Sequence, residues 1–167
     1  MRNRRFFSSH LPGHIRTSLP RDARASATEV ADGNWVAAGR THLWIGEHSY
    51  PWTDFRSVEW DGDRRTLTLY NVDGGQQIVE LAHDDVYTFT TAVRERLEAS
   101  IAYHLDVEIP DGLVQVLIRR GADGTLLSQT IVLGRDFDAQ ALADPQIARM
   151  ISRAEAQARQ AVGWSGA

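Results

Sequence analysis

Asp-Gly pairs recur at five positions and constrain the fold of this chain more than any other feature. Gly adopts positive φ without steric cost and Asp tolerates the left-handed region, so an Asp-Gly pair between alternating runs predicts a β-hairpin. The pairs are Asp32-Gly33, Asp61-Gly62, Asp73-Gly74, Asp111-Gly112 and Asp123-Gly124. The second and third pairs, like the last two, are 12 residues apart, a spacing that suits short antiparallel strands.

Strand-like runs fill the intervals between the early pairs. In Arg65–Val72, Leu67 and Leu69 share one face and polar residues the other, which is typical of a half-buried antiparallel strand. Six strands are predicted before the first helix, over residues 25–31, 34–39, 41–47, 54–60, 65–72 and 76–82.

The apolar period then changes, which predicts a helix after Asp84-Asp85, with the two Asp as its cap. Its apolar stripe is Val86, Phe89, Val93, Leu97, Ile101 and Leu105. Three further strands are expected over 104–110, 112–120 and 125–133. Asp144-Pro145 then opens a second helix, with Asp as cap and Pro in the first turn, and Gly163 ends it.

These elements divide the chain into a flexible basic tail over 1–23, a β-meander plus helix over 24–103, and a second meander plus helix over 104–167. The last part is too small to fold alone, so we expect it to pack on the first and continue its β-structure. The nearly continuous apolar run 112–120 predicts a central strand that is covered on both faces.

The segment "YPWTDFRSVEWDGDRRTLTLYNVDGGQQIVELAHDDVYTFTTAVRERL" resembles the second half of a bacterial PH-like domain, as in uncharacterised actinobacterial proteins. Upstream, "NWVAAGRTHLWIG" resembles the preceding hairpin, so the resemblance covers about residues 24–103. It implies an α+β fold, a partly open antiparallel β-barrel closed by a helix, which the three-stranded meander and C-terminal helix would follow. A PH barrel has seven strands, whereas six are predicted here. The resemblance implies binding or scaffolding more than chemistry.

The composition excludes several chemistries. The chain has no Cys and no Lys, which excludes thiol nucleophiles, Cys-ligated zinc, Schiff bases and a P-loop lysine, and fits a reducing cytoplasm, where we expect the protein. His83 beside Asp84 and Asp85 is interpreted as part of a helix start, and Pro12-Gly13 separates His10 from His14. We therefore predict no enzyme, no cofactor and no metal site.

The charge is unevenly distributed. Residues 1–24 have a net charge of +5 and the other 143 residues have −9, so the body would repel a phosphate backbone or an anionic bilayer. We therefore expect no nucleic-acid partner for the body, and only the tail could contact a membrane surface. One alternative function is thus a membrane-surface or nucleic-acid adaptor that uses Arg2, Arg4 and Arg5 beside two Phe.

The leading hypothesis is a non-enzymatic PH-like interaction module that binds a protein. A second copy of itself is one candidate partner, through the Ala-rich stripe of the last helix. Its candidate surface residues are Trp52, Arg56 and Trp164, and Trp52 is the Trp expected to be partly exposed. A third hypothesis is a small-ligand-binding protein or enzyme with a barrel pocket, lined by Arg40, His42, Trp52 and Arg56.

Overall fold

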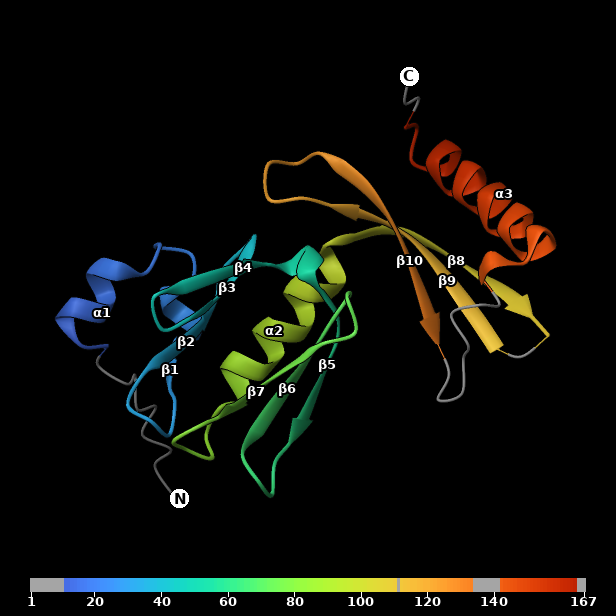
Figure 1. Ribbon diagram of the computed structural model, residues 1–167. Coiled ribbons are helices and arrows are strands. Elements are labelled where there is room, and N and C mark those ends of the chain that lie inside the picture. Colours follow the sequence, from blue (N-terminus) through green and yellow to red (C-terminus); the bar gives the residue numbers. More distant parts are fainter. Residues whose placement is uncertain (1–10, 111, 134–141, 165–167) are drawn as a thin grey trace, which may run out of the picture.

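A computed structural model describes residues 11–110, 112–133 and 142–164, as drawn in Figure 1. Among these residues, seven strands precede the first long helix. A four-stranded antiparallel sheet runs in chain order through β1 (Thr28–Glu29), β2 (Trp35–Ala38), β3 (His42–Ile45) and β4 (His48–Pro51). A three-stranded sheet follows, with β5 (Phe55–Asp61), β6 (Thr66–Asn71) and β7 (Gln76–Glu80). The two sheets meet at a single bridge, Val30–Leu81, and form no closed barrel.

The strand beyond the six predicted is β4. It pairs with β3 through the register Ile45–His48, so the hairpin loop has only two residues, Gly46 and Glu47. Gly46 has φ +59°, the conformation that such a tight turn requires. The sequence signal for this hairpin was therefore a single Gly without a preceding Asp.

Most of the predicted Asp-Gly hairpins are confirmed. The Gly of three pairs has positive φ (Gly33, Gly74 and Gly124), and the Asp side chain accepts a backbone N–H from two residues ahead in each turn. In the Asp61-Gly62 turn, positive φ falls instead on Arg65 (φ +54°). The pair at 111–112 lies partly outside the described residues.

Helix α2 (Tyr87–Ala99) lies between the two sheets in Figure 1 and fills the core of the first unit. Its buried face consists of Phe89, Val93 and Leu97. The strands and the residues next to them contribute the rest of this core: Val30, Val36, Ala38, Leu43, Trp52, Phe55, Leu67, Leu69, Val79 and Leu81, with Val86 before the helix.

Helix α2 is shorter than predicted. It ends at Ala99, and Ile101 and Leu105 belong to strand β8 (Ile101–Ile109), so the boundary predicted at residue 103 falls inside a strand. A spacing of four residues fits both elements, because it is close to one helical turn and is also a multiple of the two-residue strand period. The alternate residues Tyr103, Leu105, Val107 and Ile109 pack into one core, as a strand requires.

The second unit is a separate antiparallel sheet in the order β10-β9-β8, with β9 (Gly112–Arg120) and β10 (Leu126–Leu133) beside β8. Helix α3 (Pro145–Ala161) packs on one face of it, over Val114, Val116 and Ile118. The expectation that this sheet continues the β-structure of the first unit is therefore wrong. The central position of β9 is confirmed, and Leu117 and Arg119 on its other face are also buried.

The segment expected as a flexible tail is packed from residue 11 onward. Helix α1 (Gly13–Ser18) and the 3-10 turn η1 (Arg24–Ser26) bring Leu19 and Ala23 against Ala37 of β2. The Oγ of Ser26 accepts a hydrogen bond from Ala38 N at 2.8 Å and so extends the edge of the sheet. Leu11, Ile15 and Leu19 recur every fourth residue, which is the sequence signal for this docking. Arg2, Arg4 and Arg5 lie outside the described residues.

Candidate functional site

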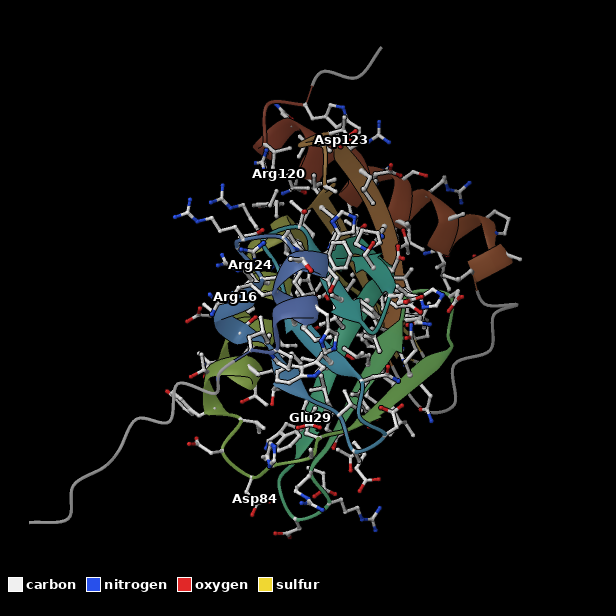
Figure 2. The ribbon with its side chains drawn as sticks, turned by 90° about the vertical axis from the view of Figure 1, so that its left-hand side faces the viewer. Arg16, Arg24, Glu29, Asp84, Arg120 and Asp123 are labelled. Carbon is white, nitrogen blue, oxygen red and sulfur yellow. The ribbon has the colours of Figure 1, made fainter. Side chains whose placement is uncertain are left out.

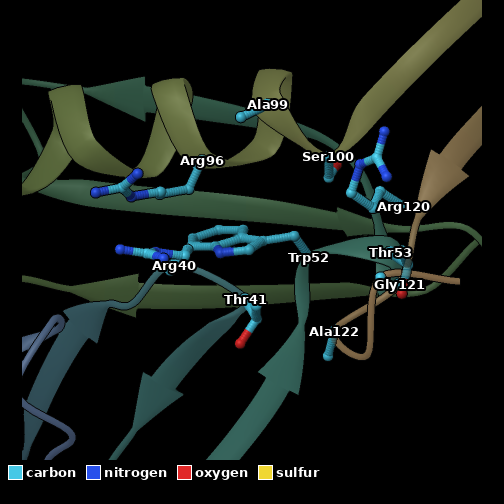
Figure 3. A pocket seen from close by; sticks show the side chains of 11 residues that line it. Arg40, Thr41, Trp52, Thr53, Arg96, Ala99, Ser100, Arg120, Gly121 and Ala122 are labelled. Carbon is cyan, nitrogen blue, oxygen red and sulfur yellow. The ribbon is translucent and has the colours of Figure 1, made fainter.

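A cleft of about 210 Å³ lies where the two units meet, and Figure 3 shows the side chains around it. Four segments line it: the β2–β3 turn, the 3-10 turn η2 (Trp52–Asp54), the end of α2, and the β9–β10 hairpin. We call this site the arginine cleft. Its lining residues are Arg40, Thr41, Trp52, Thr53, Arg96, Ala99, Ser100, Arg120, Gly121, Ala122 and Gly124.

Trp52 lies at the floor of the arginine cleft. The sequence analysis expected this residue to be partly exposed, and that is wrong, because only 2% of its surface is accessible. Extended Pro51 (φ −63°, ψ 145°) leads into η2, and the indole Nε1 donates to Gly39 O at 3.0 Å. The hydrogen bond anchors the ring, which also packs against Phe55 with the centroids 6.3 Å apart and the ring planes tilted by 60°.

The β2–β3 turn holds Arg40 and Thr41 at the rim. The backbone N–H of Arg40 donates to the Asp22 carboxylate at 2.6 Å, and the Thr41 carbonyl accepts from Trp52 N at 3.2 Å. Gly39 is tightly enclosed, since a Cβ there would lie 3.1 Å from His42 O. These contacts hold the backbone on either side of Arg40 in place, and the Arg40 side chain lines the cleft.

Arg119 lies behind the floor and joins the two units. Its Nη1 donates to Phe55 O at 2.8 Å, and its Nη2 donates to Trp52 O and to Ser100 Oγ, both at 2.6 Å. Gln129 of β10 accepts from the same guanidinium at 3.2 Å, and its own amide donates to a carbonyl of η2 at 2.8 Å. Two backbone carbonyls of the first unit are therefore satisfied by a side chain of the second.

This guanidinium is a buried cation held by neutral oxygens. Its side chain is fully buried, and no carboxylate among the described residues forms a salt bridge with it. Burial lowers the pKa of Arg119 to about 10, opposed by the charge of Asp54. Arg119 remains protonated at neutral pH, so it contributes a fixed positive charge directly behind Trp52 and Ser100.

The three arginines that line the cleft come from three elements and sit at two ends of it. Figure 3 shows Arg40 and Arg96 on either side of the Trp52 ring, and Arg120 beside Ser100 at the opposite end. None of the three pairs with a carboxylate within the part of the chain that the structure describes. The Nε of Arg96 is also buried without a hydrogen-bond partner there.

Two carboxylates near the site are already engaged by backbone groups. Asp22 accepts from Arg40 N, and Asp123 accepts from the N–H and the hydroxyl of Thr125 within its own turn, which lowers its pKa. Figure 2 shows Arg16 and Arg24 on the same face as Arg120, whereas Glu29 and Asp84 lie toward the other end. The residues that line the cleft include three arginines and no Asp or Glu, so the lining itself is positively charged, although the whole chain has a net charge of −4.

The residues predicted for an interaction surface lie apart from one another. Arg56 lies over the Tyr70 ring of the neighbouring strand, 5.6 Å from its centroid. Trp164 folds back onto α3, where Arg159 lies 4.3 Å from the ring centroid. Of the residues predicted for a barrel pocket, the structure brings Arg40 and Trp52 together in the cleft.

His42, the remaining residue predicted for the pocket, does not line the arginine cleft; its Nδ1 lies 2.9 Å from the Thr41 hydroxyl at the rim. Arg96, Arg119 and Arg120 were not predicted as site residues. The sequence did contain a signal for Arg119 and Arg120, because they directly follow the apolar run of β9. Arg119 lies on the same face of this strand as the apolar Leu117.

The comparisons with known proteins add no relative. No family model matches the chain, and no curated protein and no solved structure is significantly similar to it. No helix in the described ranges is both long and apolar enough to cross a bilayer. The same residues contain no group of three or more His, Asp or Glu that is arranged to hold a metal ion.

Proposed function

We propose that this chain is a PH-like interaction module that performs no chemistry and binds a protein partner at the arginine cleft. The observation that carries this proposal is that Arg40, Arg96 and Arg120 line one cleft and pair with no carboxylate of a described residue. Arginine is enriched at protein interfaces because its planar guanidinium binds carboxylates with two parallel hydrogen bonds. Three such groups left free by the fold are available to a ligand.

The order of elements in the first unit supports the PH-like part of the proposal. A four-stranded sheet, a three-stranded sheet and a helix follow one another along the chain, and the seven strands equal the number in a PH barrel. The helix fills the space between the sheets with Phe89, Val93 and Leu97. In this proposal the first unit is the scaffold, and the second unit supplies one wall of the binding site.

We propose a different protein, rather than a second copy, as the partner. The Ala-rich stripe of α3 is largely used within the chain, because Ala154 and Ala158 are buried against the third sheet. Met150 and Ala161 remain exposed, which offers a second copy little apolar area. The arginine cleft, in contrast, is open to solvent and positively charged.

Site-directed photo-crosslinking tests this proposal. A benzoylphenylalanine at Ala122, whose exposed methyl group lines the cleft, is compared with one at Ser152 on the outer face of α3. In cells of the source organism, we expect the first position to crosslink a discrete protein, and Arg96→Gln to abolish that product. Equal labelling from both positions, or none from Ala122, would contradict the proposal.

A further inference from the structure

We infer that the arginine cleft takes an acidic peptide segment in which an apolar side chain lies between two carboxylates, an inference that rests on the function proposed above. The placement of charge is the first reason. Arg40 and Arg96 flank Trp52, and Arg120 stands at the Ser100 end, so the cations form two groups and do not surround one point (Figure 3). A ligand that satisfies both groups must carry separate negative charges.

The surface between the two ends is the second reason. Ala99 and Ala122 present methyl groups there, and Trp52 forms the floor. An apolar side chain placed over these residues loses contact with water without leaving a polar group unsatisfied. The middle of the bound segment is therefore expected to be apolar.

The size of the cleft is the third reason. Its 210 Å³ is below the range of roughly 300–1,000 Å³ typical of pockets for drug-sized ligands and cofactors. A few side chains of an extended segment fit this space. In an extended peptide, residues i, i+2 and i+4 share a face, so the sequence Glu-Gly-Leu-Gly-Glu presents acidic, apolar and acidic groups in the required order.

Other anions match the cleft less well. A single phosphoryl group concentrates its charge at one point, whereas the arginines lie at two ends. An anionic membrane is a broad surface and the site is a cleft, and residues 25–167 have a net charge of −9, which opposes approach to a bilayer. Carboxylates also match the planar guanidinium groups, which bind them with two parallel hydrogen bonds.

Fluorescence anisotropy with a labelled peptide tests the inference on the full chain. The probe has Glu-Gly-Leu-Gly-Glu at its centre, flanked by Gly and Ser, and a matched peptide has Gln at both acidic positions. We expect the Gln peptide to bind at least tenfold more weakly, because charge-assisted hydrogen bonds are about twice as strong as neutral ones. Replacing Leu by Ser is expected to weaken binding about threefold.

Variants of the protein locate the binding site. Arg40→Gln removes one of the two cations beside Trp52, and Arg120→Gln removes the cation at the Ser100 end. Both positions are exposed, and each variant is expected to weaken binding of the acidic peptide about tenfold. Arg153→Gln makes the same charge change on the exposed face of α3 and is expected to leave affinity unchanged. Thermal unfolding followed by circular dichroism confirms that the variants fold.

Each outcome decides the matter. Equal binding of the Glu and Gln peptides, or an Arg153→Gln loss equal to that of Arg120→Gln, overturns the inference. Tighter, arginine-dependent binding of a phosphoserine peptide or of phosphatidylserine vesicles also overturns it and assigns a phosphoryl ligand or a membrane instead. If the acidic peptide fails while Ala122 still crosslinks a partner, the proposed function stands and only the chemistry of the bound segment is wrong.

Discussion

The two units of this chain build their cores in different ways. The first places α2 between two sheets, so its core includes large side chains such as Trp52, Phe55 and Phe89. The second lays α3 on one face of a single sheet, and two of the helix residues at the centre of that contact are Ala154 and Ala158. A one-sided core leaves the other face of the sheet to be covered by something else.

Part of that other face is covered by the first unit, and the contact is largely polar. Leu117 and Arg119 of β9 are buried on the side away from α3, and the hydrogen bonds of Arg119 and Gln129 reach the carbonyls of η2 and Phe55. The difference between the units explains where the cleft lies. It forms at this junction, where the β2–β3 turn, η2, the end of α2 and the β9–β10 hairpin meet over the ring of Trp52.

The largest expected effect comes from comparing one large-to-small substitution in each of the two cores. Phe89→Ala removes a side chain that is 2% exposed at the centre of the first unit, and we expect it to lower the free energy of unfolding by about 4 kcal/mol. Ile147→Ala, in the first turn of α3, is expected to cost about 2 kcal/mol. Ile loses fewer buried atoms than Phe, and the one-sided core of the second unit can close more easily over the cavity that is left. Urea unfolding measures both. A larger cost for Ile147→Ala would reverse the comparison of the two cores.

The next effect concerns the junction. Arg119→Met removes every hydrogen bond between this guanidinium and the first unit, so the Phe55 carbonyl loses its Arg119 donor and the Trp52 carbonyl keeps only the backbone N–H of Phe55. A buried group left unsatisfied costs about 1–3 kcal/mol, so we expect a loss of about 2 kcal/mol by urea unfolding. Arg120→Met, at the next and exposed position, is the control and is expected to change stability by less than about 0.5 kcal/mol.

A stability of Arg119→Met equal to or above that of the parent would show that the cost of burying the cation outweighs its hydrogen bonds. The junction would then not be what joins the units, and the second unit would depend on its own core alone. Arg119 and Arg120 are adjacent in sequence and receive the same substitution, so any difference between the two variants reports the buried position of Arg119.

Local elements were predictable from the sequence because they depend on short-range chemistry. The Asp-Gly turns and the capped start of α3 at Asp144 need only a few neighbouring residues, and the structure has them where they were predicted. The end of α2 was not predictable from spacing, because residues 97, 101 and 105 suit a helix and a strand equally. The third sheet and its junction depend on contacts across the chain.

The candidate site shows the same limit. Arg40 and Trp52 were proposed as pocket residues, yet nothing local links them to Arg96, which follows them by 56 and 44 positions, respectively. Sequence reasoning treats arginine as a surface residue, and Arg119 departs from this because the carbonyls of Trp52 and Phe55 accept from its guanidinium. A buried arginine is identified only when its acceptors are known.

The starts of the two helices give a smaller contrast. Asp144 caps α3, with its Oδ1 accepting from Gln146 N at 2.7 Å and from Ile147 N at 3.3 Å. The cap predicted for α2 at Asp84-Asp85 is wrong, because its N-cap residue is Val86, which makes no side-chain bond. We therefore expect Asp144→Ala to cost about 1 kcal/mol and Asp85→Ala less than about 0.5 kcal/mol in urea unfolding. Equal costs would contradict this difference between the helices.

The smallest expected effect tests how Arg119 is held. Asp54 is the acidic residue whose charge acts on Arg119, and desolvation raises the pKa of Asp54 above its ordinary value in spite of the attraction of His42 and Arg119. Below that raised pKa the folded chain holds a proton that the unfolded chain releases, so stability falls as the pH rises through this window. At neutral pH the ionised carboxylate therefore destabilises the fold slightly.

Asp54→Asn imitates the protonated carboxyl group, so it is expected to raise the free energy of unfolding at pH 7. The gain should be only about 0.3 kcal/mol, because the group is largely exposed and solvent screens its charge. At pH 3.5, where the parent carboxyl is itself mostly protonated, the two proteins should unfold at the same urea concentration. A variant less stable than the parent at pH 7 would mean that Asp54 acts as a counterion to Arg119. The junction would then be an ion pair, whereas the distances indicate a cation that backbone carbonyls and neutral side chains hold in place.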